Sequence, residues 1–124
     1  MEFIGLGHDI IEVSRIEKSL ASHGERFYLK LFTPEEIAYC LSKADPAIHF
    51  AGRFAAKEAI AKGLGTGFGE HVKWLEISII NDFSGKPKVK LTGKTALNHQ
   101  DFHIAVSISH IKELASAVAF IYQF

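Results

Sequence analysis

The pattern of hydrophobic and polar positions changes its period about halfway along the chain. In the first half, apolar residues recur every three or four positions in segments that start at capping residues and stop at glycines, as in amphipathic helices. In the second half, short apolar segments alternate with polar residues and are separated by turn residues, as in strands. Helices followed by strands predict an α+β fold.

The individual elements are placed by their start and stop signals. A glycine-rich strand over 3–10 opens the chain, and helices are expected from Ser14 to Gly24, over 26–32, from Thr33 to about Ser42 and from Asp45 to Gly63. Ser14 with Glu17 matches a capping box, and prolines follow Thr33 and Asp45 at first helical positions. A hairpin of strands 72–80 and 88–91, a short helix from Thr92 to about His99, and strands 102–108 and 114–122 complete the prediction. No repeat or linker interrupts residues 1–124, so we expect a single domain.

Two glycine-rich segments predict close approaches of the backbone. Gly5 and Gly7 interrupt the first strand, as happens where another backbone element packs against a strand. The segment 63–69 has glycine at every second position, which permits positive φ angles and lets backbone amides approach a ligand. We therefore interpret residues 63–69 as a candidate ligand-binding loop.

Charge and composition limit the partners of the chain. Its 124 residues include 14 Lys+Arg and 14 Asp+Glu, so it has no global basic field for non-specific binding to nucleic acid or lipid. Cys40 is the only cysteine, which excludes an internal disulfide and fits a reducing compartment. No apolar run approaches the roughly 20 residues that span a bilayer, and the N-terminus does not resemble a signal peptide. We expect a cytoplasmic protein without nucleic-acid or membrane partners.

The helix before the glycine loop carries the first candidate chemistry. Phe54, Glu58 and Lys62 are four residues apart and share one face, with Arg53 and Lys57 along an adjacent edge. Spacing alone favours a surface ion pair between Glu58 and Lys62, worth about 0.3 kcal/mol. The neighbouring glycine loop makes a phosphate-binding site the alternative.

Two further candidates lie near the ends of strands. Asp9 follows the glycine-rich strand and is a candidate to join Glu58 as an oxygen ligand of magnesium, which prefers one or two carboxylates plus substrate phosphates. The alternative is that Asp9 caps the turn into the first helix. His110 ends a predicted strand, where a lone histidine is more often structural than catalytic.

Three segments together resemble the signatures of one enzyme family. Residues 7–16 (GHDIIEVSRI), 52–59 (GRFAAKEA) with Lys62, and 106–110 (VSISH) are similar in sequence, order and spacing to the holo-acyl-carrier-protein synthases, the short 4′-phosphopantetheinyl transferases. The resemblance covers essentially the whole chain. It implies the 4′-phosphopantetheinyl transferase fold, with helices packed against a mainly antiparallel sheet, and a homotrimer with each active site at a subunit boundary.

The resemblance also implies an activity. This is the magnesium-dependent transfer of 4′-phosphopantetheine from coenzyme A to a serine of apo-acyl carrier protein, in support of fatty acid biosynthesis. Asp9 of one subunit and Glu58 of another would hold the metal, Glu58 would take the serine proton, and Lys62 would stabilise the leaving phosphate. The substrate-binding residues would be Arg53, Gly65, Gly85, Lys86, Pro87 and His110.

By the same resemblance, an acidic carrier protein would dock on the first helical region. The residues that would receive it are Arg15, Lys18, Arg26, Phe27 and Lys30. Neighbouring glutamates at 12, 17 and 25 dilute this positive patch, and the alternative is an ordinary solvated helix face.

Three other functions use parts of the same pattern. A metal-dependent phosphohydrolase needs the acidic pair and the lysine but no carrier-protein serine. A coenzyme-binding module needs only the glycine loop and basic residues, and a structural interaction domain needs neither. Three motifs in register favour the transferase over these alternatives.

Overall fold

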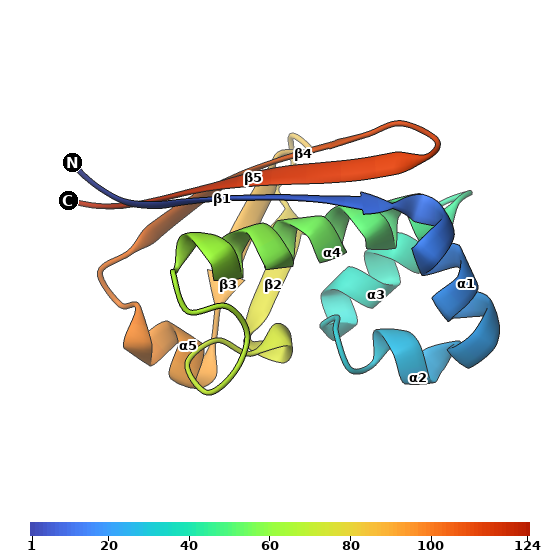
Figure 1. Ribbon diagram of the computed structural model, residues 1–124, viewed down its shortest axis with the longest axis horizontal. Coiled ribbons are helices and arrows are strands. Elements are labelled where there is room, and N and C mark those ends of the chain that lie inside the picture. The colour runs from blue at the N-terminus through green and yellow to red at the C-terminus, as the bar shows by residue number, and fades with distance from the viewer.

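A long helix and the sheet that covers it form the centre of this computed structural model, which describes residues 1–124 (Figure 1). The helices are α1 (Val13–His23), α2 (Glu25–Tyr28), α3 (Pro34–Leu41), α4 (Pro46–Gly63) and α5 (Gly93–Asn98), and a 3-10 turn covers Trp74–Glu76. The strands are β1 (Glu2–Glu12), β2 (Ile77–Asn81), β3 (Pro87–Leu91), β4 (His103–His110) and β5 (Leu114–Gln123). The predicted α+β class is confirmed, and no helix has the length and apolar character needed to cross a membrane.

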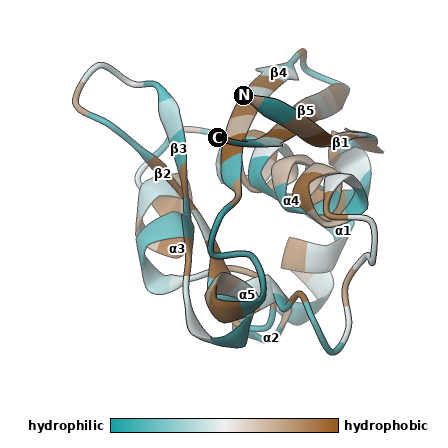
Figure 2. Cartoon of the chain, turned by 90° about the vertical axis from the view of Figure 1, so that its left-hand side faces the viewer, coloured by the Kyte–Doolittle hydropathy of each residue, from teal (hydrophilic) through white to brown (hydrophobic).

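All the strand pairs are antiparallel. The three-stranded sheet has the order β1-β5-β4 and lies over α4, while β2 and β3 form a separate hairpin whose loop projects from the body (Figure 2). Helices α1, α2 and α3 gather around the first half of α4 (Figure 1). The chain therefore has a sheet on one side of α4, three short helices around the start of α4, and a hairpin beside α4.

Strand β1 lies directly against α4 because two of its residues have no side chain. A Cβ atom at Gly7 would lie 1.7 Å from the carbonyl oxygen of Ala59, and one at Gly5 would lie 2.0 Å from that of Gly63. The predicted close approach is confirmed, and the second backbone is that of α4. This contact brings Asp9, two residues after Gly7, beside the last turns of the helix.

Helix α4 is buried over most of its circumference. Among residues 51–62, only Phe54, Glu58 and Lys62 escape full burial, so the face predicted from their spacing is the accessible one. Arg53 and Lys57, along the adjacent edge, are buried, with exposed fractions of 5% and 0%. Their side chains point toward α3 and β2, which pack over that side of α4.

Two predicted element starts are wrong. Ser14 does not cap α1: the helix begins at Val13, whose amide donates to the carbonyl of Glu113 at 2.9 Å, so pairing with β5 continues up to the helix. Strand β2 begins at Ile77 rather than at 72, because residues Trp74–Glu76 form a 3-10 turn. The ring of Trp74, in this turn, stacks on the ring of Phe68 with centroids 3.8 Å apart.

The start of α3 follows the sequence signal closely. Thr33 accepts a hydrogen bond from the Glu36 amide, and the Glu36 side chain accepts one from the Thr33 amide, with Pro34 at the first helical position. Asp45 and Thr92 stand at the predicted starts of α4 and α5, but their side chains make no capping hydrogen bond. Cys40, in the last turn of α3, is a fully buried free thiol.

Candidate active site

Asp9 and Lys62 meet where β1 passes the end of α4. The Lys62 Nζ atom donates to Asp9 Oδ1 at 3.0 Å and to the carbonyl of His8 at 3.1 Å. The Lys62 side chain is 52% exposed and that of Asp9 is 16% exposed, so solvent and substrates can reach the pair. The ion pair expected between Lys62 and Glu58 from spacing alone is replaced by a pair with Asp9.

Glu58 belongs to the same group of charges. Burial raises the pKa of Glu58, the negative charge of Asp9 raises it further, and the positive charge of Lys62 lowers it. The two carboxylates are therefore neighbours within a single chain. The meeting of Asp9 and Glu58 that we expected across a subunit boundary does not need a second subunit.

The acidic pair fits the donor set that magnesium uses with phosphate substrates. Magnesium takes one or two carboxylates and fills its remaining positions with water and substrate oxygens. No group of three or more His, Cys, Asp or Glu side chains in the chain could hold a metal ion by itself. Asp9 and Glu58 would thus supply two oxygen ligands and leave the other positions to the substrate.

A cavity of about 470 Å³ collects five of the six predicted substrate-binding residues. It lies between α4, the turn that joins β2 to β3, and the end of β4, and we call it the basic cavity. The predicted residues that line it are Arg53, Gly85, Lys86, Pro87 and His110. The volume lies in the range of small-molecule sites.

Three polar residues of the basic cavity lie outside the three sequence motifs and were missed by the sequence analysis. They are Tyr39, His49 and Asn81. His49 lies one turn before Arg53 on α4, so helical spacing could have found it. Tyr39 and Asn81 come from α3 and the end of β2, and no spacing along the chain marks their proximity to Arg53.

Tyr39 and Asn81 hold the guanidinium of Arg53. Its Nη2 atom donates to Asn81 Oδ1 at 3.0 Å, and its central carbon lies 3.9 Å from the centroid of the Tyr39 ring. Its Nε atom is buried and has no hydrogen-bond partner. A buried donor without a partner is costly, so Arg53 is suited to receive an anion in the cavity.

Gly65 lies apart from the basic cavity. Gly65 and Gly67 have φ angles of 90° and 66°, as the glycine pattern predicts. Their amides, however, donate to the carbonyls of Lys62 and Ala61 at 3.0 and 3.2 Å. These two amides complete the end of α4, and the approach of this loop to a ligand stays a prediction.

A buried ion pair joins α4 to α3 and β2. The Lys57 Nζ atom lies 2.6 Å from Glu36 Oε1 and donates to the carbonyl of Leu31 at 2.7 Å, and both charged side chains are fully buried. The other carboxylate oxygen of Glu36 accepts from the Ile79 amide at 2.8 Å. Burial lowers the pKa of Lys57, whereas the carboxylate of Glu36 raises it. This pair fixes the helix that carries Glu58.

The predicted docking residues fall into two groups. Arg26, Phe27 and Lys30 line a cavity of about 350 Å³ together with His23 and Leu31. Arg15 and Lys18 are exposed on α1 outside this cavity. An apolar ring surrounded by basic side chains suits a partner that presents an apolar side chain among acidic ones.

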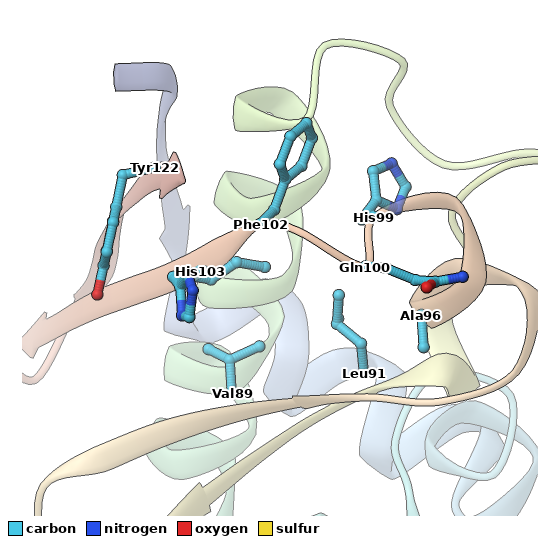
Figure 3. Close-up of a pocket in the computed structure, with 9 residues that line it drawn as sticks. Val89, Leu91, Ala96, His99, Gln100, Phe102, His103 and Tyr122 are labelled. Atoms are coloured by element: carbon cyan, nitrogen blue, oxygen red, sulfur yellow. The ribbon is translucent and has the colours of Figure 1, made fainter. Parts of the chain in front are cut away.

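A further cavity, of about 320 Å³, contains none of the predicted residues (Figure 3). It lies between β3, α5 and the start of β4. The His99 Nδ1 atom lies 2.7 Å from the carbonyl oxygen of Thr95, and the ring of His103 stacks on that of Tyr122 with centroids 5.3 Å apart. Its histidines thus have partners within the protein.

Comparisons with known proteins agree on the family of this chain. The family profile of the 4′-phosphopantetheinyl transferase superfamily matches residues 5–119. A holo-[acyl-carrier-protein] synthase of Chlamydia pneumoniae is 47% identical over 119 residues, which cover 96% of this chain and 97% of that protein. The synthase of Protochlamydia amoebophila is 44% identical over 116 residues, with 94% and 95% coverage.

Solved structures agree in the same way. The crystal structure of the holo-[acyl-carrier-protein] synthase of Neisseria meningitidis matches with a TM-score of 0.89 and 31% identity, and covers 98% of this chain and 99% of its own. The synthase of Bacillus anthracis in complex with CoA (3′,5′-ADP) matches with a TM-score of 0.86 and 35% identity over 100% of both chains. The chain therefore belongs to the 4′-phosphopantetheinyl transferase superfamily and, within it, to the holo-[acyl-carrier-protein] synthases.

Proposed function

We propose that this chain transfers the 4′-phosphopantetheine arm of coenzyme A to a serine of apo-acyl carrier protein, with release of adenosine 3′,5′-bisphosphate. The observation that carries the proposal is that the three motifs fold into two complementary groups, an acidic one at Asp9 and Glu58 and a basic cavity around Arg53. Relatives of this chain are named for this activity, and two similar structures contain coenzyme A. The product, holo-acyl carrier protein, supports fatty acid biosynthesis.

The acidic group suits the reacting phosphate. Magnesium held by Asp9 and Glu58 would neutralise the charge of the pyrophosphate and of the leaving group. Glu58 is our candidate to accept the serine proton, directly or through a water, because its raised pKa makes it a stronger base than an ordinary carboxylate. The Lys62 side chain is half exposed, so its ammonium can turn from Asp9 to the leaving phosphate.

The basic cavity suits the nucleotide part of coenzyme A. Arg53 and His110 would contact its phosphates, with Lys86 as a further cation, because all three line the cavity. The Gly85-Lys86-Pro87 turn, which lines the cavity, would border the adenine. Gly65 lies outside the basic cavity and its amide donates to the carbonyl of Lys62, so we assign it no contact through that amide.

We further propose a homotrimer in which each site is completed by a second subunit. Within one chain, none of Asp9, Glu58 or Lys62 lines the basic cavity, so the two groups are separate. The outer face of the three-stranded sheet exposes apolar side chains, including Leu6 at 60% and Ile10 at 57%. A closed ring of subunits that buries this face would bring the acidic group of one subunit to the basic cavity of the next.

The remaining proposals concern the carrier and the compartment. We propose that acidic acyl carrier protein docks on α1 and α2 through Arg15, Lys18, Arg26 and Lys30, with Phe27 as the apolar anchor. We also propose that residues 1–124 act as one domain in the cytoplasm, where the single free thiol stays reduced.

The decisive experiment is intact-mass analysis of apo-acyl carrier protein after incubation with this protein and coenzyme A. We expect a phosphopantetheine-sized mass gain with magnesium and none with a chelator. Glu58→Gln should abolish the gain, since the amide can neither bind the metal well nor accept the proton. Glu70→Gln, at an exposed position outside both groups, is the matched control and should keep full activity.

The other outcomes of this assay identify the alternatives. Breakdown of coenzyme A with no change in carrier mass would indicate a phosphohydrolase. Binding of coenzyme A without either reaction, for several folded carriers, would indicate a binding module. Circular dichroism of Glu58→Gln separates loss of chemistry from loss of fold.

A further inference from the structure

A histidine outside the family motifs lies in the wall of the basic cavity. His49 stands one turn before Arg53 on α4 and lines the cavity together with His110 from β4. The two imidazole rings have centroids 5.9 Å apart in an edge-to-face arrangement, and the His49 ring lies 5.7 Å from that of Tyr39. His49 therefore lies on the helix that presents Arg53 and faces the strand that presents His110.

The side chains around His49 are mainly basic. Arg53 shares its helix, His110 faces it from β4, Lys43 approaches from the segment after α3, and Asp45 at the start of α4 is the one acidic neighbour. Burial lowers the pKa of His49, His110, Lys43 and Arg53 lower it further, and Asp45 raises it. His49 is consequently neutral at neutral pH while the cavity holds no anion.

The cavity is suited to an anion that carries more than one charge. Arg53 lines the cavity, and Asn81 and Tyr39 hold its guanidinium, so a fixed positive charge lies at the cavity wall. A phosphate monoester has a second pKa of about 6 and is largely a dianion at neutral pH. Coenzyme A carries one monoester, on its ribose, whereas its other two phosphates form a pyrophosphate with no proton of this kind.

We propose that His49 joins Arg53 and His110 in binding the phosphate monoester of the nucleotide, and that it takes up a proton as the nucleotide binds. The inference rests on the proposed function and adds a residue and a pH dependence to it. A dianion beside His49 reverses the sign of the local charge and stabilises the imidazolium. The affinity for coenzyme A should then rise as the pH falls from 8 to 6.5, because protons become more available.

Isothermal titration calorimetry in two buffers with different ionisation enthalpies counts the protons taken up with coenzyme A. At pH 7 we expect net uptake for the wild-type protein and much less for His49→Phe, which keeps an aromatic ring beside Tyr39. The variant should bind coenzyme A about tenfold more weakly at pH 6.5 and within about twofold of wild type at pH 8. The matched control is His71→Phe, at an exposed position outside the cavity, which should behave as wild type.

Dephospho-coenzyme A, which lacks the monoester, tests the identity of the bound group. His49→Phe and wild type should bind it equally at every pH. Equal loss of affinity for both coenzymes, or undiminished proton uptake by the variant, would overturn the inference. If His49→Phe does not fold, His49→Gln takes its place. Carrier modification by the wild-type protein is followed in parallel by mass, and its absence would count against the proposed function instead.

Discussion

Glu58 illustrates how the position of one side chain determines its chemistry. It is four residues from Lys62, yet the lysine pairs with Asp9, and burial together with the Asp9 charge raises the pKa of Glu58. Metal binding and proton acceptance both require the ionised carboxylate. In the metal-free protein, Glu58 should therefore take up its proton at a higher pH than an ordinary glutamate does.

Asp9→Asn should lower the pKa of Glu58, because the change removes a negative charge while keeping the size of the side chain. Titration of the Glu58 carboxyl carbon by NMR in metal-free protein measures this shift directly. Glu12→Gln, which removes an exposed charge later in β1, should leave the pKa of Glu58 unchanged. An equal or higher pKa in Asp9→Asn would show that Asp9 does not act on Glu58.

At this scale the sequence predicted which face of α4 is accessible but not which charges are buried. The spacing of Phe54, Glu58 and Lys62 follows from helix geometry alone. The burial of Arg53 and Lys57 depends on α3 and β2, which pack on α4 from other parts of the chain. For the same reason, Tyr39 and Asn81 could not be assigned to the site from the sequence.

At the scale of elements, local signals were reliable only where no other element competed. The Thr33 capping box formed because its donors and acceptors lie within four residues. Ser14 carries the same signal, but pairing of β1 with β5 continues to Glu12 and α1 starts one residue before Ser14. Register and packing between distant segments thus override local preference.

The buried ion pair of Lys57 and Glu36 should contribute strongly to the packing of α4 against α3 and β2. Lys57→Met should lower the free energy of unfolding by about 3–5 kcal/mol, because it leaves the Glu36 carboxylate buried without a cation. Adding Glu36→Gln should recover part of this loss by removing the unpaired charge. Urea unfolding measures each change.

The exposed pair at the end of the same helix provides the comparison. Lys62→Met removes an ion pair whose lysine is 52% exposed, so we expect a loss of less than about 1 kcal/mol. Equal losses in Lys57→Met and Lys62→Met would show that burial does not strengthen the Lys57 pair.

At the scale of the whole molecule, the separation of the acidic group from the basic cavity leads to a test of the proposed trimer. Glu58→Gln and Arg53→Ala should each be inactive, since each lacks one half of every site. When the two variants are unfolded together in equal amounts and refolded, the mixture should regain up to about one quarter of the wild-type activity. At random assembly, about one in four subunit boundaries would join an intact acidic group to an intact basic cavity.

The control for this mixture is each variant refolded alone, which should stay inactive. Light scattering of the mixture gives the mass of the assembly. If the mixture forms trimers but regains no activity, both halves of each site lie within one subunit. If the mixture is monomeric, the proposed trimer is wrong.

The buried thiol of Cys40 can report local unfolding of this protein. Burial raises the pKa of Cys40 to about 12, so almost no thiolate exists at neutral pH and α3 shields the sulfur from reagents. Because the chain has no other cysteine, any maleimide that becomes attached marks a molecule in which α3 has detached. The rate of this labelling would follow local unfolding beside the basic cavity without any engineered probe.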